Sequence, residues 1–351
     1  MIPKFFRHRF WALITAGFFG VIGFGTFAHA QNSALSNSDT FTANTIDIPF
    51  DSEVDSVSMM ADGFDQVDDP VEDSRVVIGS DDRQPVLSGM YPWSSMGRLE
   101  WQIEGNATYT CTATLIAPDA VLTNSHCLEL PLPDESGEPV KTFISSDFYT
   151  FLVENNRDLG LKMVFKPSLI EGIALDEAEV VSYESGWSID YNHPKDDWAV
   201  LKLSKSLGNT FGYMGWRNLD FEDQALVDES FEKINLLGYA GDFPTEALRE
   251  FGEPRETAGV DLACSILGVW LEGPLEDMLI HDCDTNPGAS GGPIFAKFTD
   301  DKYYLVGLHA RHTPLVEPIT LRNGVTTNVV NGGVEVSRWQ AAAVWAVAGS
   351  D

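Results

Sequence analysis

From residue 76 onward, the sequence predicts an all-β fold, arranged as barrels or as a sandwich. Short apolar or alternating runs recur along the chain, with Gly, Pro, Asp and Asn between them, which is typical of strands joined by turns. The segment 76–351 is too long for one small barrel and suits two stacked units. Its last stretch, 337–348, is rich in alanine and therefore favours a helix.

The predicted strands share two features. They hold Val, Ile, Leu and aromatic residues at alternating or consecutive positions, and turn-forming residues bound them. In chain order they are GRLEWQIE from residue 97, YTCTATLIA from 109, AVLTN from 120, EVVSYE from 179, WAVLKL from 198, KINLLGYA from 233, GPIFAKF from 292 and YYLVGLH from 303.

Residues 1–30 have the pattern of an export signal. An apolar run over 10–27 ends in Ala28-His29-Ala30, a cleavage site of the small-x-small kind, and the run follows three basic residues, Lys4, Arg7 and Arg9. An uncleaved membrane anchor is the alternative, but the run is glycine-rich and short for a membrane span. We therefore expect cleavage after Ala30 and a secreted or periplasmic protein without a stable membrane anchor.

Residues 31–75 differ in composition from the rest of the chain. They are rich in Asp, Glu, Ser, Asn and Thr, and Arg75 is their only basic residue. Such a composition predicts an acidic pro-segment or linker outside the folded domain. In the first case "SRVVIG" at 74–79 is a processing junction and Val76 becomes the new amino terminus. In the second case the linker stays attached.

The charge balance excludes one class of partner. The chain has 53 Asp and Glu against 22 Lys and Arg, a net charge of −31, so it lacks the basic surface that nucleic acids need. No phosphate-cradling glycine loop and no zinc-like spacing of cysteine and histidine occur, so we expect no metal and no cofactor. We expect a monomer whose partners are protein or peptide substrates.

Four cysteines allow three pairings in an exported protein. Local pairing is the simplest, with one disulfide between Cys111 and Cys127 and another between Cys264 and Cys283.

A serine among small residues is the first candidate for catalysis. "GASGG" at 288–292 fits the G-x-S-x-G elbow of α/β-hydrolases, but the chain lacks the alternating strands and helices of that fold. Upstream, "LTNSHCLEL" places His126 just after a predicted strand, and "KDDWAVLKL" places Asp197 directly before one. The chain order of histidine, aspartate and serine is one of the known orders of a catalytic triad.

Three motifs give these residues a family resemblance. "LTNSHC", "DWAVLKL" and "GASGGP" resemble the histidine, aspartate and serine motifs of chymotrypsin-like (trypsin-like) serine proteases. The resemblance spans about residues 76–345. It implies two antiparallel six-stranded β-barrels, about 76–205 and 206–336, followed by a C-terminal helix at about 337–348. The triad then lies in the cleft between the barrels.

The resemblance also implies a role for each residue. Ser290 is the nucleophile and His126 its general base, while Asp197 orients the imidazole. Asp196 is a rival carboxylate, but only Asp197 abuts the apolar run. The backbone N–H groups of Gly288 and Ser290 form the oxyanion hole. A catalytically inactive protease fold used for binding is the alternative of another class, but such proteins usually lose a member of the triad.

One residue of the serine motif differs from the trypsin-like pattern and points to a narrower branch of the family. Ala289 replaces the aspartate that precedes the serine in trypsin-like enzymes, so activation at Val76 must work differently. "SRVVIGSDDRQPV" and "DTNPGASGGP" resemble the bacterial glutamyl endopeptidases. In that branch a threonine and a histidine at the positions of Thr285 and His309 receive the substrate carboxylate. The competing interpretation is trypsin-like: Asp284, six residues before the serine, would bind Arg or Lys.

Overall fold

The computed structural model describes residues 77–103, 105–133, 139–155, 160–221, 234–271, 275–321 and 324–349. The predicted signal, the acidic segment 31–75 and Val76 lie outside these residues, so those three interpretations stay predictions.

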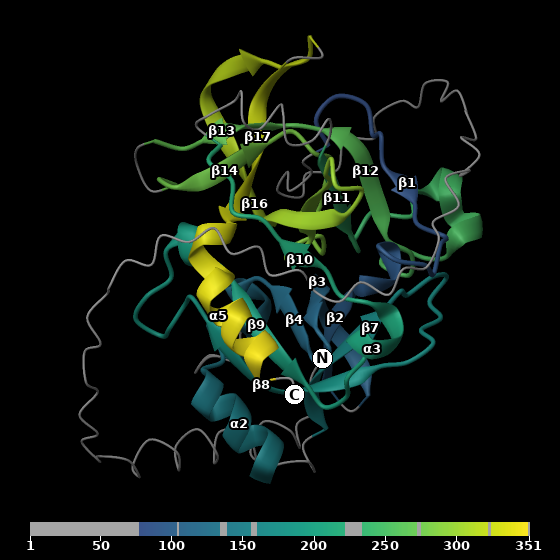
Figure 1. Ribbon diagram of the computed structural model, residues 1–351, viewed down its shortest axis with the longest axis vertical. Helices are drawn as coiled ribbons and strands as arrows, with labels where there is room; N and C mark the ends of the chain where they lie inside the picture. Colours follow the sequence, from purple (N-terminus) through teal and green to yellow (C-terminus); the bar gives the residue numbers. More distant parts are fainter. Residues whose placement is uncertain are drawn as a thin grey trace. The chain divides into compact units, whose positions relative to one another are not determined.

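Six strands of the first half form a closed antiparallel barrel, which confirms that part of the predicted fold (Figure 1). Around the barrel the order is β2-β3-β4-β9-β8-β7. Burial roughly alternates along β8, whereas β4 and most of β9 are buried on both faces, which explains why some runs alternate and others are continuously apolar. The bounds are Met96–Ile103 for β2, Asn106–Ala117 for β3, Ala120–Thr123 for β4, Leu161–Pro167 for β7, Ala178–Ser185 for β8 and Ala199–Leu203 for β9.

The second half is a nine-stranded sheet. Its order is β1-β12-β11-β15-β16-β17-β14-β13, and β10 pairs with β16 beside this path. Closure into a second six-stranded barrel is not among the pairings of the described residues, so it stays a prediction. The bounds are Gln84–Pro85 (β1), Gly215–Trp216 (β10), Ile234–Gly238 (β11), Gly259–Cys264 (β12), Ile266–Val269 (β13), Met278–His281 (β14), Pro293–Lys297 (β15), Tyr303–Thr320 (β16) and Thr326–Glu335 (β17).

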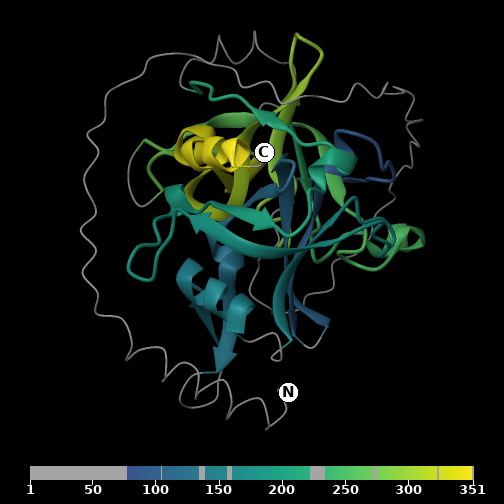
Figure 2. The same cartoon turned by 60° about the horizontal axis from the view of Figure 1, so that its bottom comes forward.

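The amino-terminal strand does not belong to the half in which the sequence placed it. The predicted first barrel began at residue 76, but β1 pairs with β12 of the second sheet, and Gln84 lies opposite Val260. The described chain therefore starts on the second half and enters the first barrel only at β2. Figure 2 shows the long β16–β17 hairpin projecting beyond the rest of its sheet.

Short helices and one hairpin complete the fold. The hairpin is β5 with β6, Glu129–Pro133 and Pro139–Phe143. The helices are α2 (Ser146–Asn155), α3 (Gly208–Phe211) and α5 (Val336–Ala348), with 3₁₀ turns η1 (Trp93–Ser95), η2 (Ser125–Leu128), η4 (Pro194–Asp196) and η5 (Glu246–Phe251). Among the described residues, no helix combines the length and apolar character that a membrane span needs.

Helix α5 confirms the predicted C-terminal helix and joins the two halves. It follows β17 of the second sheet, yet it contacts β3, β4 and β9 of the first barrel (Figure 1). Trp339 is fully buried within a core that also includes Leu122 of the barrel and Leu305 of the sheet. One continuous apolar core therefore runs from one half into the other, beneath the loops that carry the candidate site.

Candidate active site

His126 and Asp197 come from two loops of the first barrel and meet in the structure. His126 lies in η2, directly after β4, and Asp197 follows η4 just before β9. The Nδ1 atom of His126 lies 2.7 Å from Oδ2 of Asp197, and the backbone N–H of His126 donates to Oδ1 at 3.0 Å. Both carboxylate oxygens thus bind one residue, which fixes the imidazole in position and orientation.

The neighbouring carboxylate lies elsewhere. Asp196 accepts a hydrogen bond from the hydroxyl of Tyr191 and lies 3.9 Å from the guanidinium of Arg338. Asp197, in contrast, is fully buried, and the Nδ2 of Asn124 donates to its backbone carbonyl at 2.6 Å. Of the two adjacent carboxylates, Asp197 is therefore the one that contacts His126.

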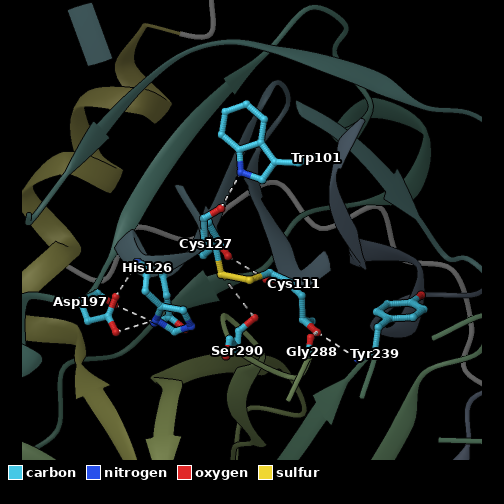
Figure 3. Close-up of a disulfide and its surroundings, with 11 residues drawn as sticks. Trp101, Cys111, His126, Cys127, Asp197, Tyr239, Gly288 and Ser290 are labelled. Carbon is cyan, nitrogen blue, oxygen red and sulfur yellow. Dashed lines mark hydrogen bonds and ion pairs between the residues drawn. A yellow bond between two sulfur atoms is a disulfide. The ribbon is translucent and has the colours of Figure 1, made fainter. Parts of the chain in front are cut away.

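A disulfide links the histidine loop to the strand beside Ser290. Cys111 on β3 pairs with Cys127, the residue after His126, and Cys264 pairs with Cys283. These are the two local pairings that the sequence favoured. The N–H of Thr112, next to Cys111, donates to the carbonyl of Ser290 at 2.8 Å. Figure 3 shows Ser290 below this disulfide, with His126 and Asp197 on one side and Gly288 on the other.

Two glycines give the serine loop its shape. Gly288 has φ +106° and Gly291 has φ +78°, both in the region that L side chains rarely adopt. A Cβ on Gly288 would lie 2.5 Å from the carbonyl oxygen of Tyr239, and a Cβ on Gly291 would lie 2.2 Å from Oγ1 of Thr123. The loop can pass this close to Tyr239 of the second half and Thr123 of the barrel only without side chains at these positions.

The N–H groups of the loop fall into two sets. Those of Ala289, Gly291 and Gly292 donate to backbone carbonyls at 2.8–3.0 Å. Those of Gly288 and Ser290 donate to no described residue. Because a backbone N–H without an acceptor is unusual, these two groups are available to bind an oxygen from outside the chain.

Ser290 and His126 line one cavity of about 490 Å³, together with Gly288, Thr285 and His309. No hydrogen bond joins the Ser290 hydroxyl to the imidazole in the described structure. Catalytic hydrogen bonds are often long before a substrate binds. The cavity places the serine, the imidazole and the two unpaired N–H groups around a common space.

Two buried histidines and a threonine form a chain at one side of this cavity. The Nε2 of His281 lies 3.1 Å from Nδ1 of His309, whose Nε2 lies 3.3 Å from Oγ1 of Thr285. Burial lowers the pKa of His281 to about 3. Burial also lowers the pKa of His309 well below its ordinary value, and nearby histidines add to this effect. Both rings are therefore neutral near pH 7.

Asp284 points to the amino-terminal segment. Its Oδ1 accepts the backbone N–H of Ile78 at 2.8 Å, and its Oδ2 accepts that of Asp82 at 2.9 Å. It does not line the cavity that holds Ser290. Burial raises the pKa of Asp284 to about 7, although the two N–H donors oppose this rise. The trypsin-like interpretation needed this carboxylate to face the substrate, and its two oxygens are already occupied.

The sequence did not single out three further residues that line the cavity, Arg98, Lys141 and Arg255. Each lies outside the three motifs and has no recognisable local pattern. Arg311 and His312, which follow His309 closely in the sequence, also line it. Arg311 comes within 3.6 Å of Oδ2 of Asp197. The cavity wall is thus more basic than the rest of the chain.

One grouping of possible metal ligands occurs in the described part of the chain. It consists of Cys111, His126 and Cys127. The two sulfur atoms form the disulfide, so they offer no thiolate to a metal. The donor set therefore does not suit a metal ion.

One family model matches more than half of the chain. The family model of the trypsin-like peptidase domain matches residues 111–308, a range that contains His126, Asp197 and Ser290. No curated protein gave a match. Among solved structures, a Glu endopeptidase in complex with MPD has a TM-score of 0.48 and 22% sequence identity to this chain. That match covers 78% of this chain and 100% of the other.

Proposed function

Because the chain belongs to the trypsin-like peptidase family, we propose that it is a secreted serine endopeptidase that cleaves peptide bonds through an acyl-enzyme. The observation that carries the proposal is the pair formed by His126 and Asp197, placed in one cavity with Ser290. The serine hydroxyl is a poor nucleophile until a base removes its proton.

The first half of the reaction makes the acyl-enzyme. Asp197 accepts the Nδ1–H of His126, which leaves Nε2 as the base that takes the proton of Ser290. The serine oxygen attacks the carbonyl carbon, and the imidazolium that forms is stabilised by the buried carboxylate. The same Nε2–H then protonates the leaving amine. A water molecule then attacks the acyl carbon and gives a proton to Nε2. The tetrahedral intermediate breaks down to the acid product as Nε2–H returns a proton to the Ser290 oxygen.

The carbonyl oxygen becomes negatively charged in each tetrahedral intermediate. The unpaired N–H groups of Gly288 and Ser290 are the donors proposed for it. They are part of a loop held by Thr112, whose Oγ1 donates to the carbonyl of Gly288 at 3.0 Å. Such donors, fixed before the substrate arrives, are worth roughly 3–4 kcal/mol each of activation free energy.

We propose further that the enzyme prefers Glu or Asp at the cleaved position. In the neutral histidine chain, His281 donates its Nε2–H to Nδ1 of His309, and His309 presents an Nε2–H toward Thr285. This arrangement leaves a lone pair rather than a proton without a partner at Nδ1 of His281. A substrate carboxylate can accept the His309 Nε2–H and the Thr285 hydroxyl.

Secretion is supported by the two disulfides as well as by the predicted signal. Disulfides persist in oxidising compartments and are rare in the cytosol.

The test is a peptide library incubated with the purified chain beginning at Val76, with Ser290→Ala as the control. We expect cleavage after Glu or Asp by the wild type only, and labelling of the wild type alone by a fluorophosphonate probe that reacts with activated serines. Cleavage after Arg or Lys would keep the mechanism and remove the acidic preference. Equal binding of peptides by both forms, without cleavage, would support the inactive-protease alternative.

A further inference from the structure

The cavity that holds Ser290 is basic in an acidic protein. Among the described residues that line it, four are Arg or Lys and a single one, Glu256, carries a carboxylate. In the whole chain the balance is reversed, with 53 acidic and 22 basic residues. A local concentration of positive charge in a cleft attracts anionic groups from solution, even where the remaining surface repels them.

One of these four charges is already neutralised by a partner within the chain. The guanidinium of Arg98 lies 2.8 Å from Oε2 of Glu100, whose side chain is almost completely buried. Lys166 binds the other oxygen of the same carboxylate at 2.6 Å. Arg98 therefore belongs to a structural ion-pair network.

Arg311 also has a partner within the chain. Its Nη2 lies 3.6 Å from Oδ2 of Asp197, so its charge acts on the catalytic carboxylate itself. Replacing it would alter the triad as well as the substrate site, and its effects could not be separated.

The side chains of Lys141 and Arg255 make no ion pair and no hydrogen bond with any described residue. The Nζ of Lys141 lies over the ring of Tyr109, 6.0 Å from its centroid, whereas Arg255 lies beside the serine loop. The Nη2 of Arg255 would lie 2.7 Å from a Cβ placed on Gly241, and the carbonyl oxygen of Pro287 would lie 3.1 Å from the same point. The guanidinium thus lies over Gly241, beside the loop that leads to Gly288. It is an exposed charge without an ion-pair partner among the described residues, and it lines the cavity that holds Ser290.

The backbone of Arg255 is held in an unfavourable conformation. Its φ is +71°, which residues with a side chain seldom adopt. Its N–H donates to the carbonyl of Phe243 at 2.8 Å, and its carbonyl accepts Nη1 of Arg98 at 2.8 Å. Backbone strain maintained by surrounding contacts is concentrated at functional sites. Arg98 therefore fixes the backbone from which the Arg255 side chain extends.

We propose that Arg255 is a specificity-determining residue that binds the carboxylate of a second acidic side chain, next to the residue whose peptide bond is cut. The substrate class is then peptide segments with clustered Asp and Glu. A planar guanidinium fork matches a carboxylate with two parallel hydrogen bonds. The inference rests on the proposed peptidase function and adds a second recognition site to it.

The test compares peptides that differ in one neighbour of a single cleavable Glu. One peptide has only small neutral neighbours, one has a second Glu on the amino side, one has it on the carboxyl side, and matched peptides carry Lys at those positions. kcat/KM is measured for the wild type, Arg255→Gln and Arg255→Lys. Arg249→Gln is the control, because Arg249 lies in the same region, pairs with Glu253 at 2.7 Å and does not line the cavity.

We expect the wild type to cleave one of the doubly acidic peptides about tenfold faster than the neutral one, the value of one charge-assisted hydrogen bond. Arg255→Gln should lose this preference yet cleave the neutral peptide within about twofold of the wild type, which also shows that it is folded. Arg255→Lys should keep part of the preference because the charge remains without the fork. High salt should reduce the preference.

Three results would overturn the proposal: no acidic preference in the wild type, an unchanged preference in Arg255→Gln, or an equal loss in Arg249→Gln. In each of these the neutral peptide is still cleaved, so the peptidase function survives. If the wild type cuts no peptide, the proposed function fails and this inference fails with it.

Discussion

The carboxylate of Asp284 binds the backbone of Ile78, which lies 206 positions earlier in the chain. The side chain of Ile78 is buried beside Leu321, at the β16–β17 hairpin. Asp284 immediately precedes Thr285 in the cavity wall. The carboxylate of Asp284 therefore ties the start of the described chain to one wall of the cavity that holds Ser290.

Replacing this carboxylate should release the amino-terminal segment. In Asp284→Ala, the N–H groups of Ile78 and Asp82 lose their acceptor, so an added protease should cut within residues 77–83 faster than in the wild type. KM for acidic peptides should rise because the loop that carries Thr285 loses its hydrogen bonds to the amino-terminal segment. Asp82→Ala is the control, since it keeps the backbone donor. Unchanged protease resistance of Asp284→Ala would contradict the prediction.

The contact between His126 and Asp197 predicts that substitutions of the two adjacent carboxylates, Asp196 and Asp197, affect kcat very differently. Asp197→Asn should lower kcat by about 10⁴-fold, because the amide favours the wrong imidazole tautomer. Asp196→Asn should leave kcat within a few-fold, because Asp196 binds Tyr191 rather than the imidazole. Steady-state kinetics on one peptide measures both. Equal losses in the two variants would exclude the assignment of Asp197.

The buried histidine chain predicts how stability depends on pH. The pKa of His281 is lowered to about 3 by burial, so between pH 3 and 6.5 the unfolded state binds a proton that the folded state does not. The stability that the neutral His281 contributes is fully present above its unfolded pKa of 6.5 and is lost as the pH falls toward 3. Denaturant unfolding at several pH values should show His281→Gln losing stability less steeply than the wild type, by about 1.4 kcal/mol per pH unit. Parallel curves would show that His281 titrates normally.

Substitutions at two glycines with positive φ distinguish the effect of backbone strain from that of a steric clash. Gly288→Ala should reduce kcat by about 10²–10³-fold, because its Cβ would meet the Tyr239 carbonyl and move an N–H donor. Gly324 has φ +86° and open space around its Cβ position. Gly324→Ala should therefore cost only about 1–2 kcal/mol of stability and leave kcat unchanged. A similar kcat in both variants would argue against the loop geometry.

Local patterns were enough to predict most of the barrel. The run WAVLKL gave β9 almost to its ends, since consecutive apolar residues before and after turns mark a buried strand. The helix α2 was missed because its aromatic and β-branched residues, among them Tyr149 and Val153, favour strands as much as helices. The strand β16 extends to Thr320, well past the predicted VGLH, because it continues into a hairpin whose partner β17 decides its length.

In the candidate site, too, some residues could be predicted from local motifs and others could not. The triad motifs are short and each lies beside a predicted strand, so their sequence and order were informative. Arg98 and Arg255 are 157 positions apart, and only the fold brings the guanidinium of one to the carbonyl of the other. The direction in which Asp284 faces also depends on a distant segment, which no local pattern reports.

The position of α5 has a consequence for the timing of synthesis. Its contacts with β3, β4 and β9 cover a face of the barrel with the last helix of the described chain. Domains form as the chain emerges, with the amino-terminal one first. This barrel, however, lacks part of its covering until the residues of α5 have been made. A nascent chain that has not yet reached Val336 therefore leaves this face of the barrel uncovered.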